Sequence, residues 1–178
     1  YLEIMTGLRR GEICGLKWSD VNFTDGTLTV RRSVSKGSGG IIIGETKTDA
    51  GMRKILLPRS VAMLLQEKRK QAVSEWIFPH YANPFEPLHP DTAYRKLKDL
   101  LSKANLPSIR FHDLRHYSAS IMHAIGIPDQ YIMERHGWSS DTVLKSVYRN
   151  TLTDKSNQFT HLANDYFADN VLARKDNA

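Results

Sequence analysis

The sequence has very few cysteines and no long apolar stretch. Its single cysteine, Cys14, excludes an internal disulfide and a cysteine-rich zinc site, and it is typical of a reducing cytoplasm. No apolar run approaches the roughly 18 residues that a membrane-spanning helix needs. No basic segment followed by an apolar one opens the chain, so no secretory signal is visible. Because residue 1 is a tyrosine, we expect a piece of a longer polypeptide.

Internal repeats and low-complexity segments are also lacking. The 178 residues are 40% hydrophobic and 25% charged, which is the composition of an ordinary globular domain and excludes collagen-like, disordered and membrane-embedded chains. A chain of this length can bury a core of its own. We therefore expect one domain, or one domain with a tail.

Positive charge is in excess over most of the chain. Lys and Arg number 25 against 19 Asp and Glu, which gives a formal net charge of +6. Residues 151–178 contain three basic and four acidic side chains, so the excess lies before residue 150. Such a surface attracts polyanions more readily than acidic substrates. A modest excess of lysine can equally serve solubility alone.

Hydrophobic patterns predict a small sheet followed by helices. Alternation over 27–35 and apolar runs at 41–43 and 55–57 are typical of strands, and turn-rich segments separate them. Beyond residue 58 the apolar residues recur at helical spacing. We expect helices beginning near 58 and 90, a third over about 112–125, shorter ones at 129–135 and 140–148, and a tail helix around 159–167. The fold class is α+β, mainly α-helical with a small three-stranded antiparallel sheet.

Two segments contain charged and polar side chains whose spacing suggests a functional site. Arg9 follows a Thr-Gly-Leu run and precedes Glu12 by three residues, which would pair them on one helical turn. His112 and Arg115 have the same spacing and would share a helix face. These two donors suit a phosphate better than a metal, because a guanidinium cannot ligate. A helix cap with an ordinary ion pair would explain the first segment as well.

Two further positions stand out only in combination with these. Lys47 lies in the turn between two predicted strands, where most lysines are simply solvated. Tyr148 follows a predicted short helix, ten residues after Trp138, and a tyrosine there is normally part of the core.

Taken in order, these segments resemble the catalytic domain of the tyrosine recombinases, the phage integrase family. The resemblance covers roughly residues 1–150 and implies a catalytic domain there, with a C-terminal helix or tail at 151–178. That tail would pack on its own domain or on a neighbouring protomer. The implied catalytic residues are Arg9, Lys47, His112, Arg115, Trp138 and Tyr148, with Glu12 supporting the first arginine.

The resemblance leaves some positions open. Where most members have Gly-His, this chain reads His-Gly-Trp at 136–138, and where a histidine often follows the tyrosine by two residues it has Asn150. The competing candidates are Arg10 for Arg9, Arg53 or Lys54 for Lys47, and His136 for Trp138.

The resemblance implies a site-specific recombinase of a phage or mobile element. Tyr148 would attack a DNA phosphodiester to form a 3′-phosphotyrosine, the arginines would neutralise the phosphate, and Lys47 would protonate the leaving oxygen. No cofactor or metal is expected. The expected partner is double-stranded DNA, bound by a homotetramer that exchanges C-terminal tails in the cytoplasm of a bacterial host, with no membrane involved.

Three other classes remain open on the sequence alone. A type IB topoisomerase shares the chemistry but relaxes DNA without a recombining partner. A non-catalytic DNA-binding module would bind equally well after Tyr148→Phe. A metal nuclease would have to use some of the seven histidines, and chelators would abolish its activity.

Overall fold

The computed structural model describes residues 1–46, 51–142, 144 and 145. The chain divides into two compact units, Tyr1–Asp141 and Thr142–Ala178, and the description below concerns the first. Lys47, Tyr148, the tail at 151–178 and, within the predicted helix at 140–148, residues 143 and 146–148 lie outside the described residues. The predicted domain boundary at residue 150 stays a prediction.

Two short helices, α1 (Leu2–Thr6) and α2 (Arg10–Cys14), open the fold. α1 ends at Gly7, which has a φ of 69°, a conformation that residues with a side chain rarely adopt. A Cβ atom at Gly7 would also lie 2.4 Å from Nε2 of His136. The turn between the two helices therefore requires glycine for conformation and for space.

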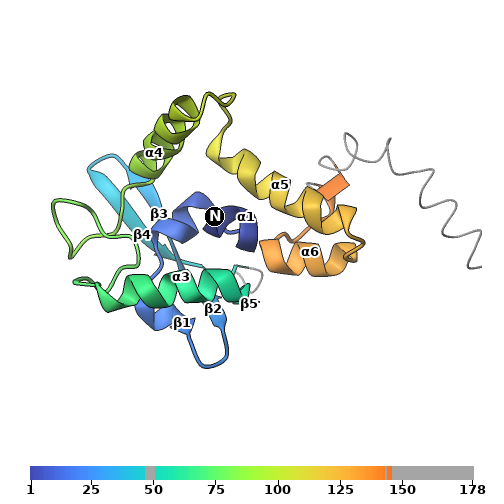
Figure 1. The fold of residues 1–178 in the computed structure, drawn as a ribbon, viewed down its shortest axis with the longest axis horizontal. Coiled ribbons are helices and arrows are strands. Elements are labelled where there is room, and N and C mark those ends of the chain that lie inside the picture. The colour runs from blue at the N-terminus through green and yellow to red at the C-terminus, as the bar shows by residue number, and fades with distance from the viewer. Residues whose placement is uncertain (47–50, 143, 146–178) are drawn as a thin grey trace, which may run out of the picture. The chain divides into compact units, whose positions relative to one another are not determined.

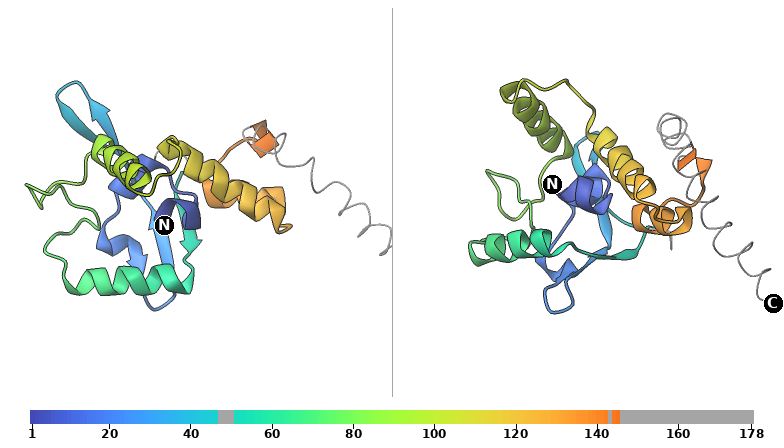
Figure 2. Two further views of the ribbon diagram at one scale, coloured as in Figure 1. Left: turned by 45° about the horizontal axis from the view of Figure 1, so that its top comes forward. Right: turned by 45° about the vertical axis from the view of Figure 1, so that its right-hand side comes forward.

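The strands form two antiparallel sheets. One has the order β1 (Val21–Asn22), β2 (Thr27–Val30) and β5 (Arg53–Leu56), and the other pairs β3 (Arg32–Gly37) with β4 (Gly40–Glu45). The single strand predicted over 27–35 is thus divided at Arg31, whose carbonyl accepts the backbone N–H of Thr46 (3.0 Å). The β3–β4 hairpin stands away from the three-stranded sheet (Figures 1 and 2).

The hydrophobic core lies between the three-stranded sheet, the first two helices and α3 (Arg59–Lys70). α3 buries Val61 and Leu65, whereas the neighbouring Leu64 is exposed. Each fully buried side chain of this size contributes about 1.5–3 kcal/mol. The buried apolar residues of this core are Leu8, Ile13, Leu16, Trp18, Val21, Leu28, Val30, Ile55, Leu57, Val61, Leu65 and Ile77.

Three further helices complete the unit: α4 (Pro90–Lys103), α5 (Phe111–Ala124) and α6 (Asp129–His136). The predicted helices near 90, at 112–125 and at 129–135 are therefore confirmed, as is the fold class. The buried face of α5 is partly polar: it includes Arg115, while the larger Tyr117 and Ile121 are exposed. In the described part of the chain, no helix combines the length and apolar composition needed to cross a membrane.

Candidate active site

The C-terminal end of α6 is where three arginines converge. The last carbonyls of a helix have no partner within the helix and form the negative end of its dipole, so they attract cations. Here three consecutive carbonyls each accept a guanidinium N–H from a different element. The pairs are Arg53 Nε to Arg135 (2.8 Å), Arg115 Nη2 to His136, and Arg9 Nη2 to Gly137 (2.9 Å).

A buried carboxylate joins two of these arginines. Glu12 is 1% exposed, and its Oε1 accepts from Nη1 of Arg9 (2.8 Å) and Nη1 of Arg53 (3.2 Å). Its Oε2 accepts from Nη2 of Arg53 (2.8 Å) and the backbone N–H of Arg9 (2.8 Å). Burial alone would raise the pKa of Glu12, but Arg53 and Arg9 outweigh it and hold that pKa below its usual value. Glu12 is therefore ionised at neutral pH.

Arg115 has no exposed surface. Its Nη1 donates to the carbonyl of Gly7, and its guanidinium lies over the indole of Trp138, with Cζ 5.2 Å from the ring centroid. This is the geometry of a cation–π contact. Burial, with the charge of Arg9, lowers the pKa of Arg115 to about 9, so it stays charged at neutral pH. Its charge therefore lies close to that of Arg9.

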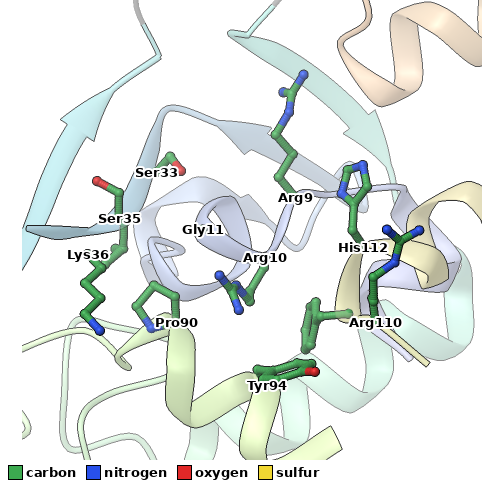
Figure 3. Close-up of a pocket in the computed structure, with 12 residues that line it drawn as sticks. Arg9, Arg10, Gly11, Ser33, Ser35, Lys36, Pro90, Tyr94, Arg110 and His112 are labelled. Carbon is green, nitrogen blue, oxygen red and sulfur yellow. The ribbon is translucent and has the colours of Figure 1, made fainter. Parts of the chain in front are cut away.

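A cavity of about 520 Å³ opens beside Arg9, between α2, β3 and the first turns of α4 and α5 (Figure 3). Figure 3 places Lys36 on one side of it and His112 and Arg110 on the other, with Arg10 between them. None of the twelve lining residues is Asp or Glu, and of its four Lys and Arg side chains Arg110 pairs with Asp113 (2.8 Å) and Lys36 with Asp91 (3.5 Å). A cavity lined in this way concentrates positive potential and suits an anion.

His112 lines this cavity from the first turn of α5, next to Phe111. Its ring meets the edge of the His116 ring, with centroids 4.6 Å apart. Burial, and then the charges of His116, Arg115 and Arg9, lower the pKa of His112. His112 is therefore neutral at pH 7 and can accept a proton.

His136 and Trp138 lie in different surroundings. His136 is fully buried, with Nδ1 2.8 Å from the carbonyl of Ile132, and burial lowers its pKa to about 4. Its ring stacks on Trp138, with centroids 4.8 Å apart. The ring of Trp138 lies against the Arg115 guanidinium, whereas His136 meets that guanidinium through its backbone carbonyl. The geometry favours Trp138 as the site residue, with His136 as its packing support.

Sequence reasoning missed the part played by Arg53, which it treated only as a competitor for Lys47. The side chain of Arg53 is 5% exposed and is tied to Glu12. Lys54 points the other way, 60% exposed and 4.0 Å from Asp25. The signal was in the strand: Arg53 is in phase with the buried Ile55 and Leu57, so alternation predicted an inward-facing charge.

No group of three or more His, Cys, Asp or Glu side chains able to hold a metal ion is found among the residues that the structure describes. Lys47 and Tyr148 lie outside that part. Of the proposed set, the structure brings Arg9, Glu12, Arg115 and Trp138 into one contact network and places His112 on the same cavity as Arg9.

Comparison with known proteins identifies the family. Residues 2–155 match the model of the phage integrase family, and the chain therefore belongs to that family. A tyrosine recombinase XerC-like protein of Caldanaerobacter subterraneus is 26% identical over 191 residues, which cover 93% of this chain and 48% of that protein.

Solved structures show the same fold. The Tn1549 transposon integrase in complex with circular intermediate DNA matches 91% of this chain and 57% of its own, with a TM-score of 0.78 and 22% identity. A lambda integrase tetramer bound to a Holliday junction matches 79% and 40%, with a TM-score of 0.53 and 28% identity. The chain spans about half or less of the length of these curated relatives. The predicted family and fold are confirmed.

Proposed function

We propose that this chain is the catalytic part of a site-specific recombinase that cuts and rejoins double-stranded DNA through a 3′-phosphotyrosine. The convergence of Arg9 and Arg115 on neighbouring carbonyls, beside a cavity lined by cations, supports it most strongly. Similar integrases were solved with circular intermediate DNA and as a tetramer on a Holliday junction. We propose DNA as the partner, a homotetramer exchanging C-terminal tails as the assembly, and the bacterial cytoplasm as the compartment.

Binding of the phosphate precedes the chemistry. A phosphodiester repels nucleophiles, and its transition state carries further charge on the non-bridging oxygens. Arg9, whose side chain is 42% exposed, and His112 line the cavity and are the proposed direct donors. Arg115 supplies a buried charge next to Arg9, and the Trp138 indole N–H is the proposed further donor.

Tyr148 and Lys47 are assigned by their places in the sequence. A free phenol has a pKa of about 10 and is on the order of 0.1% ionised at pH 7, so Tyr148 needs a proton acceptor. Neutral His112 is the proposed base. The bond from the phenolic oxygen to phosphorus forms as the bond to the 5′ oxygen breaks, and Lys47 gives that oxygen a proton. Reversal by another 5′-hydroxyl rejoins strands without a cofactor.

Tyr148→Phe tests this proposal. On nicked duplex DNA, which traps the intermediate, the wild type should form a covalent adduct that mass spectrometry maps to residue 148. The variant should form no adduct while its DNA affinity stays nearly unchanged, because only the attacking oxygen is removed. An adduct formed by the variant would move the nucleophile elsewhere, and free cleaved DNA without an adduct would indicate a nuclease.

A further inference from the structure

We infer that Arg53 is a positioning residue for DNA cleavage: it fixes the orientation of Arg9 through the shared carboxylate of Glu12 and through the end of α6. The inference rests on the proposed function, since strand cleavage is its main readout.

The hydrogen bonds of Arg53 show that it acts through other residues. Four donor contacts are made: Nε to the carbonyl of Arg135, Nη1 to Glu12 and to the carbonyl of Gly51 (3.3 Å), and Nη2 to Glu12. The side chain is 5% exposed and is not among those that line the cavity. Arg53 therefore supports the site from within the protein.

Arg9 depends on the carboxylate that Arg53 holds. Its long side chain is 42% exposed, and such a side chain loses considerable rotamer freedom when it is fixed. Arg53 binds both oxygens of Glu12 with two Nη atoms, a two-point geometry that sets the plane of the carboxylate. Because Glu12 accepts both the side chain and the backbone N–H of Arg9, that plane sets where Arg9 points.

Arg53 also holds the second anchor of Arg9. Nη2 of Arg9 donates to the carbonyl of Gly137, and Nε of Arg53 donates to the carbonyl of Arg135, two residues earlier. Both anchors of Arg9, Glu12 and the α6 end, are thus bound by Arg53. Loss of the Arg53 guanidinium would remove its bonds to both anchors at once.

The first test is Arg53→Lys in the full chain, with Arg32→Lys as the matched control. Lysine keeps the charge but cannot bridge two oxygens. Arg32 makes the same kind of contact to a different buried carboxylate, with Nη1 2.5 Å and Nη2 3.2 Å from the two oxygens of Asp20. Both variants should lose stability, so rates are compared at a temperature where circular dichroism shows both folded. If Arg53→Lys does not fold, Arg53→Gln is measured in its place.

The readout separates cleavage from binding. Wild-type protein first selects a nicked duplex from a pool of randomised sequence, and single-turnover adduct formation is then followed on that duplex. Arg53→Lys should slow adduct formation roughly 10²-fold, the effect of misplacing a reacting group by about 1 Å, with DNA affinity nearly unchanged. Arg32→Lys should keep the wild-type rate. Equal slowing in both variants, or none in Arg53→Lys, would overturn the inference.

A sulfur leaving group distinguishes positioning from proton donation. A thiol has a pKa of about 8.5, far below that of an alcohol, so a duplex with sulfur in place of the bridging 5′ oxygen needs no acid. If Arg53 positions Arg9, Arg53→Lys should stay slow on this duplex. Restoration to the wild-type rate would mean that Arg53 donates the proton, and the inference would be wrong.

One measurement does not depend on cleavage. The order parameter of the Arg9 Nε–H group, measured by ¹⁵N NMR relaxation, should fall in Arg53→Lys and stay at the wild-type value in Arg32→Lys. If this occurs in a chain that forms no adduct with any nicked duplex, the positioning of Arg9 stands and the proposed function fails. If the Arg9 signal is unchanged in Arg53→Lys, the inference fails whatever the activity.

Discussion

The surroundings of Glu12 and Asp20 are built alike. Each carboxylate is buried and accepts the backbone N–H of the residue three positions earlier, at 2.8 Å. Each also binds one well-covered arginine by two N–H groups and a second, partly exposed arginine. These are Arg53 and Arg9 for Glu12, and Arg32 and Arg31 for Asp20.

The two clusters differ in what else their arginines hold. Around Asp20, the further contact is from Arg32 to the carbonyl of Gly15 (3.1 Å), a local one. Around Glu12, Arg9 and Arg53 continue to the end of α6, more than 80 residues away in sequence. The Asp20 cluster stabilises a turn, whereas the Glu12 cluster joins distant elements beside a cavity. The same chemical unit thus serves stability in one place and a site in the other.

The largest expected difference between the clusters comes from their exposed arginines. Arg9→Ala should lower the rate of adduct formation by roughly 10²–10³, the loss expected for one oxyanion donor. Arg31→Ala should leave that rate unchanged, because Arg31 is 55% exposed and its contact to Asp20 is 3.5 Å. Single-turnover adduct formation on the selected nicked duplex measures both. Equal rates for the two variants would remove Arg9 from the phosphate site.

Neutralising each carboxylate should separate stability from activity. Glu12→Gln and Asp20→Asn should each lower the free energy of unfolding by about 3 kcal/mol, because a buried charge loses its partner. Only Glu12→Gln should also slow cleavage by the folded protein, by roughly 10²-fold. Urea unfolding and adduct formation give the two values. Equal cleavage rates for the two folded variants would contradict the role of the Glu12 cluster in cleavage.

Glu3 sharpens the comparison, since it is a buried carboxylate without such arginine bonds. It is 3% exposed, and neither oxygen has a hydrogen-bond partner among the described residues. Burial raises the pKa of Glu3 from 4.5 to about 8, although Arg115 acts in the opposite direction. The folded state therefore binds the proton more tightly than the unfolded state. The contribution of protonated Glu3 to the free energy of unfolding is fully present below pH 4.5 and is lost as the pH rises through about 8.

Glu12 behaves in the opposite sense. The pKa of Glu12 is lowered, so its contribution to the free energy of unfolding is present above the ordinary pKa of a glutamate and is lost as the pH falls through the folded-state pKa.

Glu3→Gln removes the group whose pKa is raised. The free energy of unfolding of this variant, relative to that of the wild type, should therefore rise by roughly 2–4 kcal/mol from about pH 5 to pH 9. Urea unfolding at both pH values measures this. A difference that does not change with pH would show that Glu3 titrates normally.

The smallest effect concerns lysines. Lys36 lines the cavity, whereas Lys68 of α3 lies over the ring of Phe78, 5.7 Å from its centroid. Lys36→Ala should reduce the dependence of DNA affinity on salt by about one counterion, and Lys68→Ala should not. Fluorescence anisotropy across a salt series measures the slopes. A flat salt response of the wild type would count against DNA as the partner.

Much of the fold followed from local patterns. The helices near residues 90, 112 and 129 were predicted because the helical spacing of their apolar residues lies within the segments themselves. The division of the strand at Arg31 and the polar buried face of α5 were not, since each depends on a partner elsewhere. Arg115 is buried because the carbonyls of Gly7 and His136 receive it, and no hydrophobic period records such a contact.

The site was predicted as residue types in order, and its arrangement was not. Order and spacing placed Arg9, Glu12, His112 and Arg115 in one set. They could not choose between His136 and Trp138, because the choice depends on which ring meets a guanidinium. Nor could they separate a solvated basic residue from the buried Arg53, except through the strand alternation that it shares with Ile55.

By itself, the sequence determined the family, the excess of positive charge and the local elements, because these depend on neighbouring residues and on composition. The tertiary structure decided which carbonyls hold the arginines and that Arg53 joins Glu12 to α6. The physical reason is the range of the contacts: Arg9 binds a carbonyl 128 positions away. Only folding brings such groups within hydrogen-bond distance.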